Sequence, residues 1–165
     1  MKHLKTSITL LLLLTVTVVF AQSPRKQVKG KVGSATINID YGSPSVKGRV
    51  VWGGLEAYGK VWRAGANENT TVSFDKEVTV GGEKLAAGKY GFFIIPNENA
   101  DWIVIFNKKN ADWGAYSYQQ SQDALRISIK PEFVKDNQEA LEYSVGKSGI
   151  DFAWEKARIT IPVGM

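Results

Sequence analysis

GKYGFFIIPNENADWIVIFN, residues 88–107, contains two strongly apolar segments. Residues 92–95 and 102–106 carry large apolar side chains at consecutive positions, so neither segment alternates between apolar and polar residues. A strand of an antiparallel sandwich normally turns one face to the opposing sheet and the other to water. We therefore predict two strands here, and we expect another part of the chain to cover their second face.

Half-buried strands are expected on both sides of this stretch. Residues 35–41, 125–129 and 141–145 alternate between apolar and polar side chains, which is typical of a strand with one wet face. The pair Gly81-Gly82 indicates a tight turn. Tyr90 follows Leu85 and Gly88 as in the tyrosine corner of Greek-key sandwiches. We found no amphipathic helix after residue 21, and we predict an all-β antiparallel sandwich of the Greek-key or jelly-roll kind.

The last segment changes its alternation. Apolar residues occupy even positions in residues 150–154 but odd positions in residues 159–163. One face of a regular strand cannot change parity, so we predict a bulge or a turn between Glu155 and Arg158.

Residues 1–21 have the features of a secretory signal peptide, with Lys2 and Lys5 before an apolar run and Ala21 before the expected cleavage site. The alternative is a membrane anchor, but the apolar run is shorter than a bilayer requires. We expect a periplasmic or secreted protein that is not inserted in the membrane after cleavage. Residues 22–28 are expected to form a polar leader, and residues 29–165 a single domain.

The composition excludes several classes of function. Removing Lys2 and Lys5 lowers the formal net charge from +5 to +3, and the remaining charges are scattered, so we expect no nucleic-acid partner. The chain has no cysteine, and its one histidine, His3, lies in the expected signal peptide. Cys/His zinc sites and histidine acid–base catalysis are therefore excluded. We expect no metal site and no cofactor, and the sequence identifies no protein partner.

Residues 41–71, YGSPSVKGRVVWGGLEAYGKVWRAGANENTT, show no sustained strand or helix period. Such a long irregular segment inside a compact domain is usually functional or disordered. Its two tryptophans and many other apolar residues argue against disorder. We predict an ordered crossover that packs over the doubly apolar strands and carries a site.

The site is expected where the crossover gathers aromatic, charged and amide groups between Trp62 and Asn69. Such groups commonly hold sugars or anions, through an aromatic face and directional hydrogen bonds. The competing interpretation is structural, with Trp62 in the core and the charges paired or solvated. A basic turn and an aromatic segment, DWGAYSY at residues 112–118, would add to the site. The candidate residues are Trp62, Arg63, Asn67, Glu68, Tyr41, Lys47, Arg49, Trp113 and Tyr116.

Five motifs in this order resemble the bacterial domain-of-unknown-function 2911 family. They are YGSPSVKGR, GKVWRAGANENT, LAAGKY, IVIFNK and DWGAY, and the resemblance covers roughly residues 29–163. It implies an exported β-domain protein and adds no catalytic residue.

Three functions remain open. The first is binding of a small polar ligand, either a carbohydrate or an anionic metabolite, without catalysis. The second is a hydrolase that uses Glu56, Glu68 or Asp112, because paired carboxylates can cleave glycosides. The third is a structural or protein-interaction module of the cell envelope. We assign no catalytic residue.

Overall fold

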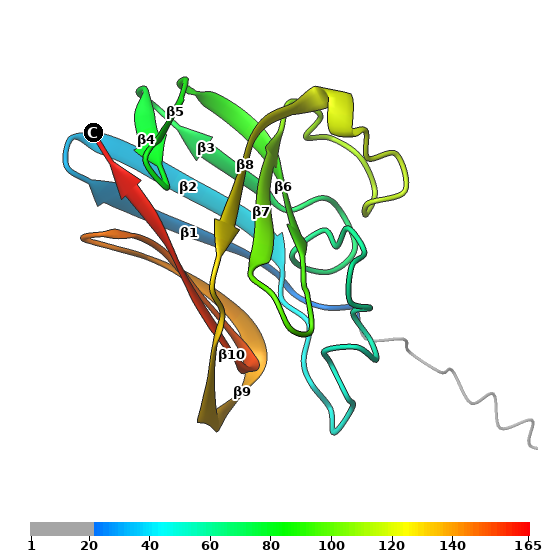
Figure 1. Cartoon of the computed structure of the whole chain (residues 1–165). Helices are drawn as coiled ribbons and strands as arrows, with labels where there is room; N and C mark the ends of the chain where they lie inside the picture. The colour runs from blue at the N-terminus through cyan, green and yellow to red at the C-terminus, as the bar shows by residue number, and fades with distance from the viewer. Residues whose placement is uncertain (1–21) are drawn as a thin grey trace, which may run out of the picture.

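The computed structural model describes residues 22–165 and shows two packed antiparallel sheets (Figure 1). The predicted all-β sandwich is confirmed. The helical element η1 (Gln120–Gln122) is a single 3-10 turn. The signal peptide predicted for residues 1–21 lies outside the described residues. Within residues 22–165, no helix is long and apolar enough to cross a membrane.

The larger sheet has the strand order β1-β2-β3-β6-β7-β8, and the smaller has the order β5-β4-β10-β9. In Figure 1 the long hairpin of β9 and β10 forms the layer opposite β1 and β2. The strands are β1 (Arg25–Val32), β2 (Ala35–Gly42), β3 (Thr71–Phe74), β4 (Val78–Val80), β5 (Glu83–Leu85), β6 (Gly88–Ile95), β7 (Trp102–Asn107), β8 (Asp123–Ile129), β9 (Glu132–Gly146) and β10 (Gly149–Gly164).

Strand β1 begins inside the segment that we expected to be a polar leader. Arg25 pairs with Gly42 and Val28 with Ile39, so residues 25–28 belong to the larger sheet. The strand lies at the edge of the sheet and its residues are mostly polar, which hid its alternation in the sequence. The correction matters for the site, because it fixes the side chain of Arg25.

The expected irregularity in the last strand is confirmed. The pairing of β10 with β9 shifts its register on both sides of Glu155, whose φ of 52° lies in the left-handed region. The bulge lets Trp154 and Ile159 both face the core despite their opposite parity.

Local turn signals also gave correct predictions. The Tyr90 hydroxyl donates to the carbonyl of Ala86 at 2.8 Å, which confirms the tyrosine corner. Gly81 and Gly82 both have positive φ in the two-residue turn that joins β4 to β5.

The crossover, residues 43–70, is ordered and packs on the sandwich as expected. Trp52 lies in the core with its ring centroid 4.5 Å from that of Trp102. Further along, Trp62 exchanges two backbone hydrogen bonds with Ile94, at 2.8 and 2.9 Å. Strand β3 pairs with residues 88–91 of β6, and the crossover forms a bridge to the same edge of β6 further along, at Ile94.

The outer face of β6 and β7 is covered by a different segment from the one we expected. Phe93 and Ile105 point away from the main core but are buried. The ring of Tyr118 lies against Phe93, with centroids 5.2 Å apart. Residues 108–122, the second loop, thus reach this face, while the crossover contributes its tryptophans to the interior between the sheets.

Candidate functional site: two depressions joined by a loop ladder

The crossover and the second loop are joined by a short backbone ladder between residues 67–69 and 112–114. Glu68 and Trp113 form an antiparallel bridge. The backbone amide of Asn69 donates to the backbone carbonyl of Asp112 at 3.0 Å. The backbone amide of Gly114 donates to the backbone carbonyl of Asn67 at 3.2 Å. A depression lies at each end of this loop ladder, as the residues that line them show.

The first, here called the arginine depression, consists of two adjoining hollows of about 230 and 250 Å³ that share Glu56 and Arg63. Its main polar or aromatic side chains are those of Arg49, Glu56, Arg63, Asn67 and Tyr116. Four of these were candidates from the sequence, and Glu56 was weighed there only as a hydrolytic carboxylate.

Arg63 is held in place from three directions. Its Nη1 donates to the carbonyl of Asn67 at 2.7 Å. Its Cζ lies 6.0 Å from the ring centroid of Tyr116. A Cβ on Gly114 would stand 2.9 Å from the same Cζ, so the guanidinium packs directly on this glycine and would have to move for a larger residue. Within residues 22–165 its Nε and Nη2 make no hydrogen bond, which leaves them available to a ligand.

Arg49 lines one of the two hollows, and its guanidinium is positioned by the backbone of the preceding turn. It donates to the carbonyl of Val46 at 3.0 Å and to that of Ser45 at 2.5 Å. Lys47, another candidate from the same turn, is exposed and lines none of these hollows.

Glu56 lies on a compact turn whose backbone is fixed by hydrogen bonds between Glu56 and Val51 and between Gly53 and Glu56, each 2.9 Å long. Burial raises the pKa of its carboxyl from the ordinary 4.5 to about 7, against the opposite effect of the Arg63 and Arg49 guanidiniums. At neutral pH this carboxyl can therefore be protonated or ionised.

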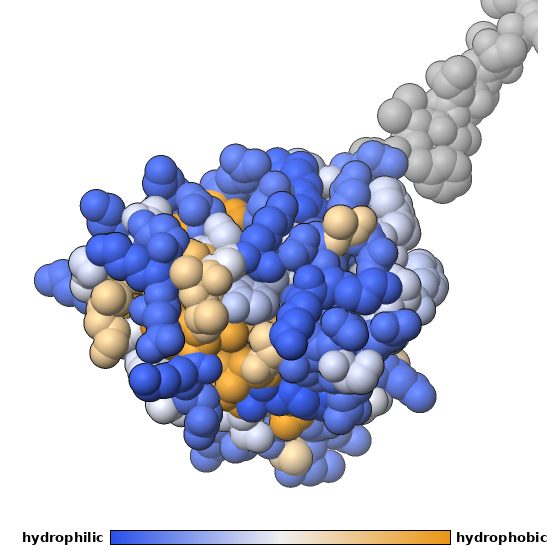
Figure 2. Space-filling model, turned by 90° about the horizontal axis from the view of Figure 1, so that it is seen from above, coloured by the Kyte–Doolittle hydropathy of each residue, from blue (hydrophilic) through white to orange (hydrophobic). Residues whose placement is uncertain are grey.

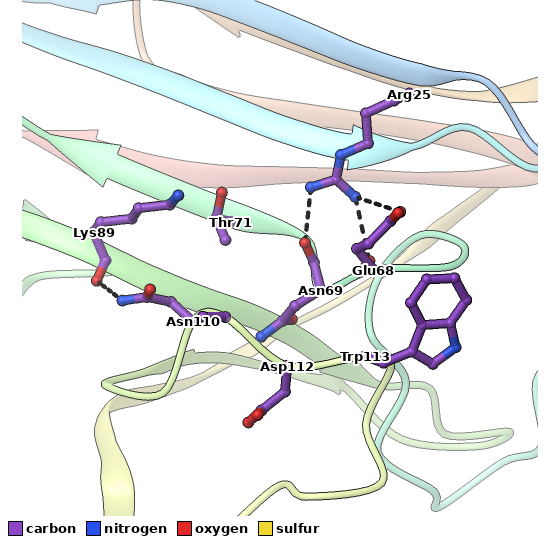
Figure 3. Close-up of a pocket in the computed structure, with 9 residues that line it drawn as sticks. Arg25, Glu68, Asn69, Thr71, Lys89, Asn110, Asp112 and Trp113 are labelled. Atoms are coloured by element: carbon purple, nitrogen blue, oxygen red, sulfur yellow. Dashed lines mark hydrogen bonds and ion pairs between the residues drawn. The ribbon is translucent and has the colours of Figure 1, made fainter.

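The second, here called the amide depression, has a volume of about 300 Å³ and is shown in Figure 3. It contains two sequence candidates, Glu68 and Trp113, together with Asn69. Arg25 reaches it from β1, Lys89 from β6 and Asn110 from the second loop. Sequence reasoning missed these three, since they lie far apart along the chain and in no common motif.

Trp62 and Tyr41 lie in the core, and Trp62 also lines one hollow of the arginine depression. Trp62 is 5% exposed, and its Nε1 donates to the carbonyl of Gly65 at 3.1 Å. Tyr41 is 1% exposed, and its hydroxyl accepts from the amide of Tyr143 at 3.3 Å. The structure therefore divides the nine candidates among the two depressions, the core and the exposed Lys47.

Comparison with known protein families matches residues 23–163 to the family described as Protein of unknown function (DUF2911). The chain belongs to this family. The match covers both sheets, the crossover and the second loop of this DUF2911 domain, so both depressions lie inside it. No curated protein and no solved structure matches the chain significantly.

The charges of the two depressions in this DUF2911 domain differ. The arginine depression has two guanidiniums and one carboxyl that is easily protonated. The amide depression has two cations, Arg25 and Lys89, and two carboxylates, Glu68 and Asp112. Among the described residues, no group of three or more potential metal-ligating side chains lies together.

Proposed function

We propose that this chain is an exported, non-enzymatic domain that binds a small anionic metabolite in the arginine depression. The observation that supports it most is the fixed guanidinium of Arg63, which faces the same hollows as Arg49 and Glu56. A guanidinium that is held before the ligand arrives loses little side-chain entropy on binding, and it matches a carboxylate or phosphate with two parallel hydrogen bonds.

Glu56 is compatible with an anionic ligand in the same hollows. When protonated, its carboxyl can donate a hydrogen bond to an anionic oxygen. Its raised pKa makes protonation possible near neutral pH, so that Glu56 need not repel the ligand. The hollows, at about 230 and 250 Å³, would accommodate a small organic acid.

A thermal-shift screen of the purified protein tests the proposal, with mono- and dicarboxylates and inorganic phosphate as probes. A carboxylate at about one hundred times its dissociation constant should stabilise the fold by about 2.7 kcal/mol. Arg63→Gln should abolish this shift. Lys60→Gln is the control, because it removes a positive charge from an exposed position of the crossover. This variant should still be stabilised by the carboxylate. No shift with any probe, or equal shifts in both variants, would contradict the proposal.

A hydrolase has less support. Among residues 22–165, Glu56 is the single acid that lines the arginine depression. In the amide depression, Asp112 lies 3.3 Å from the Lys109 ammonium, and a hydrogen bond from Ser117 lowers its pKa. Glu68 lies 3.8 Å from the Arg25 guanidinium. Among the residues that the structure describes, neither depression combines a general acid of raised pKa with a second carboxylate.

An envelope interaction module has one observation in its favour. Val50 and Leu55 on the crossover, and Trp113 and Tyr116 on the second loop, are exposed large hydrophobic residues. Figure 2 shows the molecule from above the view of Figure 1, where the surface is mostly hydrophilic with a band of apolar side chains and a few separate ones. If the ligand screen gives no shift, these four side chains are the first to test for a protein partner.

A further inference from the structure

A second ligand is indicated by the side chain of Asn69 in the amide depression. This residue is 3% exposed, and neither its Oδ1 nor its Nδ2 has a hydrogen-bond partner among the described residues. A buried amide without partners destabilises a fold, and most buried polar groups in native proteins are paired. Both atoms have less than 1 Å² of accessible surface, and Asn69 lines the depression, so a bound molecule can supply both missing partners when the side chain turns outward.

The backbone of Asn69 is fixed by hydrogen bonds, and Gly91 leaves room for its side chain. The backbone N–H of Asn69 donates to the backbone carbonyl of Asp112. The backbone carbonyl of Asn69 accepts from Arg25 Nη2 at 2.9 Å. A Cβ on Gly91 would stand 2.9 Å from Asn69 Nδ2 and 2.1 Å from the carbonyl oxygen of Lys109. A glycine in β6 therefore allows the Asn69 side chain and the second loop to close over the strand.

The charges around Asn69 are balanced, which favours a neutral ligand. Arg25 pairs with Asp40 and lies 3.8 Å from Glu68, while Asp112 pairs with Lys109 at 3.3 Å. A paired charge attracts an ion weakly but still offers hydrogen-bond donors and acceptors to hydroxyl groups. The Asn69 side chain can bind two neighbouring hydroxyls. Its Nδ2 would donate to one hydroxyl, and its Oδ1 would accept from the other.

An aromatic face and a continuing groove complete the site. Trp113 lines the depression and is 52% exposed, so part of its indole can pack on the C–H surface of a sugar ring. Beyond Thr71 and Lys89, the depression adjoins a hollow of about 530 Å³ on the outer face of β1, β2 and β3. Its lining includes Gln27, Lys29, Asn38, Asp40 and Ser73, and with Lys89 it has two cations and one acid.

We infer that the amide depression and the adjoining groove bind a neutral oligosaccharide, with one sugar unit hydrogen-bonded to the Asn69 amide and resting against Trp113. The site is separate from the arginine depression, which lies at the other end of the loop ladder. A depression of about 300 Å³ would hold one sugar unit, and the groove gives room for more.

The test is a titration of the purified protein with neutral gluco-, xylo- and chito-oligosaccharides, followed by saturation-transfer NMR and tryptophan fluorescence. At least one series should bind. Asn69→Leu should weaken its binding by about tenfold or more, because two hydrogen bonds are lost in a buried place. Trp113→Ala should weaken it as well, while Tyr116→Ala is the matched aromatic control at the other depression and should not.

Three further measurements separate the possible outcomes. Asn69→Leu should leave the midpoint of thermal unfolding unchanged or raise it; a lower midpoint would mean that the amide has a structural role and would overturn the inference. Saccharide binding should survive Arg63→Gln and should change little with salt, unlike anion binding. Absence of binding by every series, as expected if a trapped water satisfies Asn69, would overturn the inference without affecting the proposed anion site.

Discussion

The indoles of Trp62 and Trp154 are stacked with their ring centroids 5.5 Å apart and an angle of 22° between their planes. Trp62 belongs to the crossover and Trp154 to β10 of the smaller sheet, so the stack connects the site-bearing segment to the opposite layer. Trp52 completes the group, with its ring 5.6 Å from that of Trp154. The backbone that presents Arg63 is therefore anchored by the residue directly before it.

Trp62→Ala should lower the free energy of unfolding by about 3–5 kcal/mol, because a large buried aromatic side chain is removed and a cavity is left. Trp113→Ala, at a half-exposed indole, should change it by about 0.5 kcal/mol or less. Chemical denaturation of both variants measures the difference. Similar effects in the two would show that Trp62 is not part of the core.

Gly114→Ala should weaken carboxylate binding, because the new Cβ would meet the Arg63 guanidinium at 2.9 Å and displace it. The substitution also introduces a side chain at a φ of +66°, which destabilises by about 1–2 kcal/mol. Gly48→Ala is the matched control, since Gly48 has a φ of +67° and open space around it. Calorimetric titration should show weaker binding in the Gly114 variant alone, and equal affinities would contradict the assigned role of Arg63.

Glu56→Gln should stabilise the protein at pH 8 and have little effect near pH 4. The folded protein holds the Glu56 proton up to about pH 7, while the unfolded chain releases it near 4.5. Stability contributed by this protonated carboxyl is complete below pH 4.5 and is lost as the pH rises through 7. The gain in the variant at high pH should reach up to about 3 kcal/mol, reduced by solvent screening. A gain independent of pH would exclude this origin.

Carboxylate binding to the arginine depression should take up protons near pH 7. An anion beside Glu56 raises the pKa of its carboxyl further, so the complex holds more protons than the free protein and the affinity falls as the pH rises through 7. Calorimetry in two buffers of different ionisation enthalpy measures the uptake. It should disappear in Glu56→Gln, and uptake that persists in this variant would assign the proton to another group.

Tyr90→Phe should lower the free energy of unfolding by about 0.5–1.5 kcal/mol, since the hydrogen bond to Ala86 is lost while the ring remains. Tyr116→Phe is the comparison, because the Tyr116 side chain is 87% exposed and its hydroxyl remains in water. Thermal unfolding of the pair tests the tyrosine corner. An effect confined to Tyr116 would be inconsistent with it.

The parts of the fold that depend on local pattern could be predicted from the sequence. The parity change around Glu155 indicated the bulge, and the spacing of Leu85, Gly88 and Tyr90 indicated the corner. The crossover could be predicted as ordered from its apolar content. The direction of Trp62 could not, because a segment without a regular period does not tell which side chains face inward.

The pairing that shapes the site was beyond the sequence. The bridge between Glu68 and Trp113 joins two irregular segments, and no local signal specifies such a partner. Arg25 was missed because an edge strand with few apolar residues resembles a solvated leader. Asn69 stood within the predicted constellation, but its lack of partners is visible only in three dimensions.

The register of the larger sheet has a consequence for the order of folding. Gly91 of β6 is paired with Thr71 of β3 on one side and with Asn107 of β7 on the other. Once these three strands are in register, the chain ends that lead to the loop ladder already lie close together. Only residue 70 and residues 108–111 separate these strands from the ladder, so the entropy of closing this connection is small compared with joining the same segments in an unfolded chain. The two depressions should therefore take shape quickly, but only after the slow, non-local pairing of the sheet is complete.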